Sequence, residues 1–222
     1  MIGTFRADGE GPRYFGIYPA IVTDIVDKDS LGRIEVKFLW LGNKGADDVR
    51  AWATLLSPYA DDNQGLEILP AVDSQVAVVF EAGNLRRPYI VGAAWNGKEK
   101  LPESPAKPNN KRLIKTRSGS LLEFDDTQGA AKVTLSMKSG HKLVLDDSAQ
   151  EVSVTHANGC LMKFDSSGNV TITATSAVTI NAPSGLTVNA PTSTFSGNIV
   201  CQGITATSVT SPLYSPGVGN VW

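Results

Sequence analysis

Hydrophobic residues between positions 17 and 95 recur in short runs, several of which alternate with polar residues. Five such runs are separated by turn-forming clusters, at 17–26, 33–41, 51–56, 75–80 and 89–94. Alternation with a period of two places one side of a segment in a core and the other in solvent, which predicts β-strands. Five short strands in one span are typical of a small closed β-barrel, with residues 1–16 as an N-terminal arm. The predicted barrel core consists of Ile34, Val36, Phe38, Trp40, Trp52, Val76, Val78 and Phe80.

A repeat with a period of about twenty residues follows the barrel. Three segments align without gaps: Gly119-Ser-Leu-Leu-Glu-Phe-Asp125, Gly140-His-Lys-Leu-Val-Leu-Asp146 and Gly159-Cys-Leu-Met-Lys-Phe-Asp165. Each segment leads through a polar turn into a second alternating strand, so the unit supplies about two strands. The predicted repeat turns carry Gly119, Asp125, Gly140, Asp146, Gly159 and Asp165.

Each predicted strand offers only two or three apolar side chains to one face, too few to be stable alone. The strands must therefore bury that face, either in a single-chain solenoid or against other copies of the chain. Two strands per unit favour an intertwined oligomer, and three-fold symmetry closes it into a prism without free sheet edges. The residues predicted to face the axis are Leu122, Phe124, Val133, Leu135, Leu143, Leu145, Val152, Val154, Met162, Phe164, Val170, Ile172, Val178 and Ile180.

Charge is distributed unevenly along the chain. Residues 166–222 contain no Asp, Glu, Lys, Arg or His, yet alternating runs at 170–173, 178–180 and 186–188 predict further short strands there rather than disorder. The domain organisation is therefore a barrel at 17–95, a Pro-rich connector and neck at 96–117, a repeat shaft at 118–210 and a tip segment at 211–222. Tyr214, Val218 and Trp222 are the predicted tip residues.

Composition excludes several classes of function. The 222 residues carry 20 Lys and Arg against 22 Asp and Glu, a net charge of −2, which argues against strong binding of nucleic acid. Two cysteines form neither a disulfide framework nor a zinc motif. The paired acids Asp125-Asp126 and Asp146-Asp147 could bind calcium, although turn capping is the simpler interpretation. No nucleophile, metalloprotease or phosphate-binding motif is present, so we expect no enzyme, no metal and no cofactor.

Several segments resemble one known family, in the same order along the chain. Leu31-Gly-Arg-Ile-Glu-Val-Lys-Phe-Leu-Trp40, Gly83-Asn-Leu-Arg-Arg-Pro88 and Trp95-Asn-Gly-Lys98 are similar to the OB domain of phage baseplate assembly protein V and VgrG spikes. The repeat from Arg117 through Phe124-Asp-Asp126 resembles the start of the family's triple-stranded β-helix. The resemblance covers roughly residues 17–200.

This resemblance implies an all-β fold, with an N-terminal OB barrel followed by an intertwined, trimeric, triple-stranded β-helix needle. It also implies a function, the homotrimeric spike of a contractile tail or injection particle, assembled in the bacterial cytoplasm and driven through the target outer membrane by sheath contraction. The chain shows no hub domains ahead of the barrel, so a separate trimeric hub protein is expected. It lacks the family's His-x-His tip motif, so the tail at 211–222 is expected either to cap the helix itself or, as the preferred alternative, to dock a PAAR-like tip protein as a further partner. The alternative function is a trimeric tail-fibre module that binds a receptor or glycan.

Overall fold

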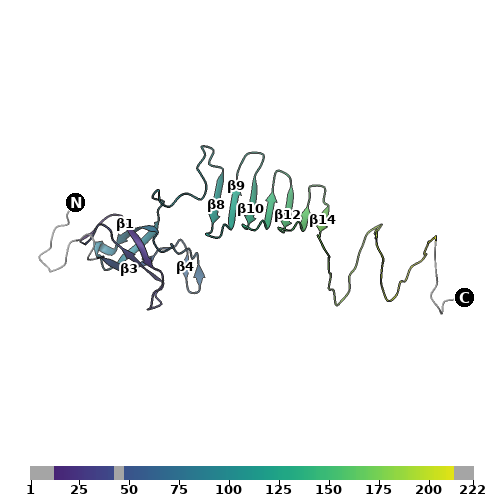
Figure 1. Cartoon of the computed structure of the whole chain (residues 1–222), viewed down its shortest axis with the longest axis horizontal. Coiled ribbons are helices and arrows are strands. Elements are labelled where there is room, and N and C mark those ends of the chain that lie inside the picture. Colours follow the sequence, from purple (N-terminus) through teal and green to yellow (C-terminus); the bar gives the residue numbers. More distant parts are fainter. Residues whose placement is uncertain (1–12, 43–47, 213–222) are drawn as a thin grey trace.

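A computed structural model of the chain describes residues 13–42 and 48–212, and the regular secondary structure of the described part is almost entirely β (Figure 1). The only helical element there is the short 3₁₀ turn η1 (Glu81–Gly83). The prediction of an all-β chain is confirmed. The described strands are β1 (Tyr18–Asp24), β2 (Arg33–Lys37), β3 (Arg50–Leu55), β4 (Ala60–Asp61), β5 (Gln64–Gly65), β6 (Gln75–Phe80), β7 (Pro88–Ala93), β8 (Lys111–Lys115), β9 (Leu121–Asp125), β10 (Lys132–Ser136), β11 (Lys142–Asp146), β12 (Glu151–Thr155), β13 (Leu161–Phe164) and β14 (Val170–Thr173).

Five strands close into a barrel in the order β1-β2-β3-β7-β6. All neighbours are antiparallel except β3 and β7, which run parallel. Alternation of side chains along the strands separates the interior of the barrel from its outer surface, because every second residue of β2 and β6 is buried. Strands β4 and β5 form a separate small hairpin beside the barrel. The buried core consists of Ala20, Val22, Ile34, Val36, Phe38, Ala53, Val76, Val78, Phe80 and Ile90.

The two tryptophans of the predicted core lie differently from its aliphatic members. Trp40 packs against the core, where its ring stacks on Tyr18 at 4.5 Å and its Nε1 donates a hydrogen bond to the Pro19 carbonyl at 3.2 Å. Trp52 lies outside the buried core. It is the neighbour of buried Ala53 in β3 and therefore points to the other side of the strand, where the Arg33 guanidinium lies 5.8 Å from its ring centroid.

Strands β8 to β14 form one seven-stranded antiparallel sheet in which each strand pairs with its neighbours in sequence. The repeats pair within one chain over residues 111–173, and the intertwined triple-stranded β-helix expected for 118–210 stays a prediction. The sheet also begins at Lys111, inside the segment predicted as connector and neck. At one set of turns the chain reverses through a glycine with positive φ, as at Gly119 (89°), Gly140 (100°) and Gly159 (95°). A side chain at these three positions would be strained.

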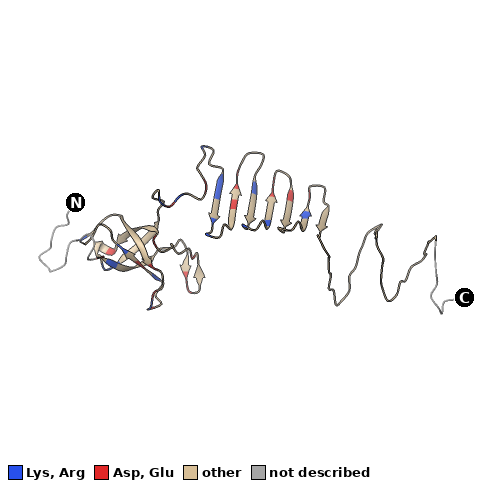
Figure 2. Ribbon diagram, in the orientation of Figure 1, with Lys and Arg blue, Asp and Glu red and all other residues tan. Residues whose placement is uncertain are grey.

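No strand is assigned to the described residues after Thr173. Residues 174–212 follow an extended zigzag path, coloured yellow-green in Figure 1, and are almost entirely exposed. The strands predicted at 178–180 and 186–188 are therefore absent from the isolated chain. The physical reason is that a β-strand is defined by a hydrogen-bonded partner, and alternation of side chains does not supply one. Figure 2 shows that this described tail carries no Lys, Arg, Asp or Glu.

Candidate assembly surface of the repeat sheet

One face of the seven-stranded sheet carries two parallel rows of apolar side chains. Cross-strand register aligns residues that are two apart in each strand, and both rows run across all the strands from β9 to β14. The first row consists of Ile114, Leu122, Leu135, Leu143, Val154, Met162 and Ile172. The second row consists of Phe124, Val133, Leu145, Val152, Phe164 and Val170. We call this surface the apolar face.

The apolar face lacks a cover among the described residues. Contact with apolar neighbours in the same row does not bury these side chains. Phe124 is 44% exposed, Leu135 47% and Ile172 62%. Monomeric soluble proteins rarely expose a contiguous apolar surface of this kind. Packing within the sheet buries only a small part of these side chains. It therefore does not account for the alignment of so many large apolar residues on one face. The arrangement therefore has the form of an interface.

The other face of the same sheet is mostly polar. Because side chains alternate along each strand, Glu123, Thr134, Ser153 and Lys163 stand back to back with the two apolar rows. Lys163 Nζ lies 3.0 Å from Glu151 Oε2, an ion pair between neighbouring strands. This face is suited to solvent, so the sheet has one side for water and one side for a partner.

The aspartates at the second set of turns bind their own loops. The Asp125 carboxylate accepts hydrogen bonds from the Thr127 hydroxyl at 2.5 Å and from its N–H at 3.0 Å, and Asp146 accepts from the Ser148 hydroxyl at 2.6 Å. Asp165 accepts from both the side chain and the N–H of Asn169. These donors stabilise the ionised form and lower the pKa of all three carboxyls.

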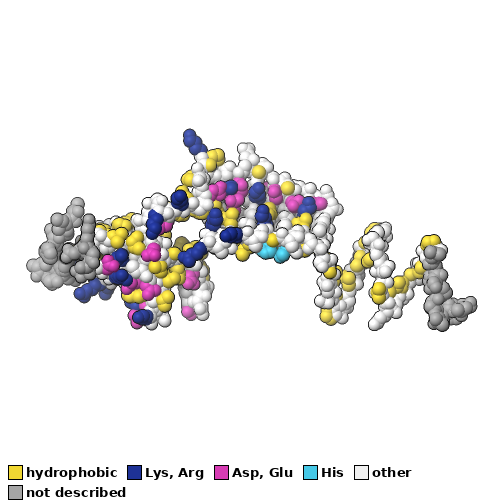
Figure 3. Space-filling model, in the orientation of Figure 1, with side chains coloured by type: hydrophobic (Ala, Val, Ile, Leu, Met, Phe, Trp, Pro, Cys, Tyr) yellow, Lys and Arg dark blue, Asp and Glu magenta, His cyan; other side chains and the backbone are white. Residues whose placement is uncertain are grey.

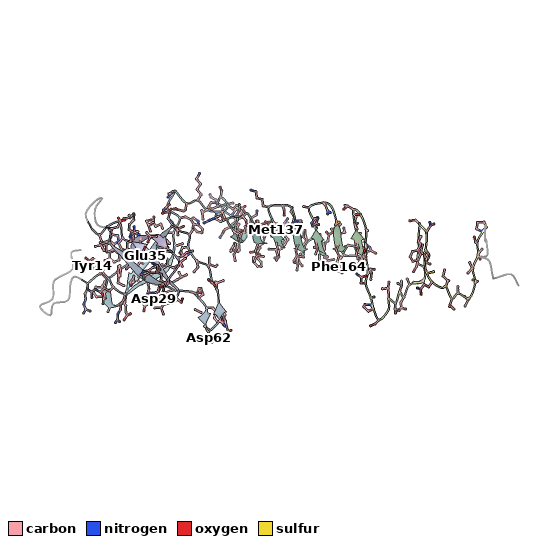
Figure 4. All side chains as sticks on the ribbon, turned by 60° about the horizontal axis from the view of Figure 1, so that its bottom comes forward. Tyr14, Asp29, Glu35, Asp62, Met137 and Phe164 are labelled. Carbon is pink, nitrogen blue, oxygen red and sulfur yellow. The ribbon has the colours of Figure 1, made fainter. Side chains whose placement is uncertain are left out.

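The structure brings together the residues predicted to face the axis, with two exceptions. Twelve of them form the two apolar rows, whereas Val178 and Ile180 lie in the extended tail and are 60% and 66% exposed. Phe164 on β13 and Met137, which follows β10, are labelled in Figure 4. The sequence interpretation missed Ile114, because the Lys and Arg residues around it concealed the strand pattern of β8. The predicted tip residues Tyr214, Val218 and Trp222 lie outside the described residues.

Within residues 13–42 and 48–212, no group of three or more His, Cys, Asp or Glu side chains is arranged to hold a metal ion. None of the described segments is a helix with the length and apolar character needed to cross a membrane.

Comparison with known proteins points to one group. Residues 18–95, which contain the barrel, match the family of type VI secretion system/phage-baseplate injector OB domains. Similar curated proteins from Pseudomonas aeruginosa PAO1 are the type VI secretion system spike proteins VgrG5 (27% identity over 112 residues, 48% of this chain and 14% of the relative), VgrG4b (30% over 133 residues, 55% and 16%) and VgrG1a (25% over 138 residues, 58% and 21%). The aligned segment is thus between about a seventh and a fifth of the length of these relatives. The closed five-stranded barrel agrees with an OB domain, and the chain is a VgrG- and baseplate-V-like protein.

Proposed function

We propose that this chain is a structural spike protein that forms a homotrimer at the baseplate of a contractile tail or injection particle. Sheath contraction drives the trimer through the envelope of the target cell, and its action is mechanical. The barrel seats the spike on a trimeric hub protein, and the far end carries a PAAR-like tip protein. The similarity to spike proteins and to injector OB domains supports this role.

The apolar face is the observation that carries the proposal. Three copies related by a rotation axis parallel to the stacking direction of the strands can turn their apolar faces inward and their polar faces outward. Fully burying a Leu, Ile or Phe side chain contributes about 1.5–3 kcal/mol, and the face supplies two such rows from every chain. The rotation produces a closed prism with a dry core, which is a stiff shaft.

The tail supports an intertwined region beyond the prism. Within residues 174–210, the one backbone hydrogen bond joins Gly185 N–H to the Ala182 carbonyl. Backbone groups that become buried require partners. In the proposed trimer, three extended tails wind around one another and supply those partners, as in a triple-stranded β-helix. The apolar residues Val178 and Ile180 then face the axis.

Mass measurement tests the proposal directly. Size-exclusion chromatography with light scattering should give three times the chain mass of 23.5 kDa, with an elongated profile. A compact particle with the mass of one chain would contradict both the trimer and the spike.

Two variants of neighbouring residues test the surface. Leu135→Asp places a charge in the apolar row, whereas Thr134→Asp places it on the polar face of the same strand. We expect Leu135→Asp to abolish the trimer and Thr134→Asp to preserve it. Equal trimer content in the two variants would show that the apolar face is not the interface.

A further inference from the structure

The strands of the repeat sheet are joined by two rows of turns, one at each end of the strands, and we call these rows its lateral edges. The two lateral edges carry charges of opposite sign. The first edge is formed by the turns at 116–120, 137–141 and 156–160, which contain no acidic residue. Arg117 and Lys138 lie in these turns, and Lys115 and Lys142 lie at the adjoining strand ends. All four are exposed and have no ion pair among the described residues. We call this the basic edge. In Figure 3 the two histidines, coloured cyan, lie along it.

The opposite edge is formed by the turns at 126–131, 147–150 and 165–169. Asp126 and Asp147 are exposed there and have no cation within ion-pair distance among the described residues. Acidic side chains, coloured magenta, gather toward this edge in Figure 3. We call it the acidic edge.

The lysines on the acidic edge are already balanced within the chain. Lys111 pairs with Glu103 at 3.0 Å and Glu123 at 3.4 Å. Lys132 lies where its charge lowers the pKa of both Asp125 and Asp146. The carboxylates of Asp125, Asp146 and Asp165 accept hydrogen bonds within their own turns. The exposed acidic side chains that these turns offer to a neighbouring copy are therefore Asp126 and Asp147.

A rotation about the stacking axis brings unlike edges together. In a three-fold cyclic assembly every contact is heterologous, so the basic edge of one chain meets the acidic edge of the next at each corner. The turns also interleave in height. Arg117 lies between β8 and β9, Asp126 between β9 and β10, Lys138 between β10 and β11, and Asp147 between β11 and β12. Neighbouring strands are about 4.8 Å apart, so successive charges alternate in sign at a spacing that long side chains can span.

We propose that the acidic edge of each chain docks on the basic edge of the next copy, with Arg117 and Lys138 interleaved with Asp126 and Asp147. This inference rests on the proposed trimer and adds a feature that determines whether its chains run in the same direction. When the chains run in the same direction, positive turns alternate with negative turns at every corner. When one chain is inverted, like edges meet and repel. The charges thus select the parallel arrangement, whereas the apolar face alone does not distinguish the two.

Charge reversal at each edge, alone and combined, tests the docking. The first variant, R117E/K138E, places acids at the interleaved turn positions of both edges, and the second, D126K/D147K, places lysines at all of these positions. The quadruple variant exchanges the charges at the four turn positions and restores their complementarity. Subunit exchange between isotope-labelled and unlabelled full-length trimers is followed by native mass spectrometry after incubation at a fixed urea concentration. We expect each double variant to exchange subunits about tenfold faster than the original chain, because several exposed ion pairs of modest strength are lost at each of three corners. The quadruple variant should return most of the way to the original exchange rate.

The control variant K28E/K98E changes the net charge as R117E/K138E does, but on exposed barrel-side residues. It should exchange at the original rate. A quadruple variant no slower than either double variant, or double variants indistinguishable from the control, would overturn the edge docking while the trimer stands. A monomeric original chain would overturn the trimer itself, so the two failures are distinguishable.

Discussion

At the scale of single residues, Asp27 organises the turn that follows β1. Its carboxylate accepts hydrogen bonds from Arg33 Nε at 2.8 Å and Nη2 at 2.9 Å, and from the backbone N–H groups of Asp29, Leu31 and Arg33. Its side chain is only 4% exposed. The Arg33 guanidinium, aided by these N–H groups, holds the pKa of Asp27 well below its usual range. A carboxyl with a depressed folded-state pKa stabilises the fold above its ordinary pKa of about 3.9 and loses that contribution as the pH falls.

Asp27→Asn removes this acid-sensitive contribution. We expect a lower thermal unfolding temperature of the barrel than that of the original chain at about pH 7. This difference should narrow at about pH 3, because the carboxyl of the unfolded chain, with an ordinary pKa, is protonated there while the folded chain still keeps it ionised. Tryptophan fluorescence of the full chain follows the barrel, because Trp40 packs on its core. A gap of the same size at both pH values would show that ionised Asp27 is not the source.

Ile34 represents the other residue-scale determinant, the buried apolar core. It is fully buried on β2, in the centre of the closed barrel. We expect Ile34→Ala to lower the free energy of unfolding of the barrel by about 2–5 kcal/mol, through lost transfer energy and the cavity left behind. Leu56→Ala, at a site 50% exposed, is the matched control and should cost much less. Similar losses in a urea titration would contradict the assignment of the core.

At the scale of elements, the sequence pattern predicted which side of a strand is buried better than it predicted which segments pair with that strand. The alternation in β2 and β6 correctly indicated strands with one buried side, because in a closed barrel each strand finds its neighbours within the chain. The pattern did not show Trp52 to lie outside the core, since a large aromatic on the outer side of a strand has the same composition signal as one inside. It also could not distinguish repeats that pair as strands within the chain, at 111–173, from a described tail at 174–212 that forms no strand.

Limited proteolysis tests that difference between the two elements. The described tail contains no Lys or Arg, so trypsin does not report on it, whereas thermolysin cuts beside apolar residues such as Leu186 and Phe195. In the proposed trimer the tails pair with one another and resist cleavage, because a protease requires an extended, unpaired segment. We expect the original chain to keep its tail and the monomeric Leu135→Asp variant to lose it rapidly, as judged by intact mass. Cleavage of both at the same rate would contradict the intertwined tail.

At the scale of the whole molecule, the distribution of charge follows the direction of the proposed movement. All the charged residues lie in the first three quarters of the chain, and none lies beyond Asp165. A charged side chain at the centre of a bilayer costs about 2.5–3.5 kcal/mol even on lenient scales. Hydroxyl-bearing side chains such as Thr171 and Thr173, on the face of β14 opposite Val170 and Ile172, keep the surface hydrated at lower cost. An uncharged leading segment thus reduces the resistance that a spike meets as it enters a membrane.

Two pairs of substitutions on the same polar face separate this effect from simple strand stacking. T171K/T173K adds charge to the leading segment, and T134K/S153K adds it where Lys132 and Lys163 already stand. For particles that carry trimers of normal mass and thermal stability, we expect the first pair to reduce penetration of target cells and the second to leave it nearly unchanged. If uncharged ladders serve only to stack without repulsion, T171K/T173K weakens the trimer, and penetration per intact trimer is unaltered. That result would show that the absence of charge near the end of the chain serves assembly of the trimer and not passage through a membrane.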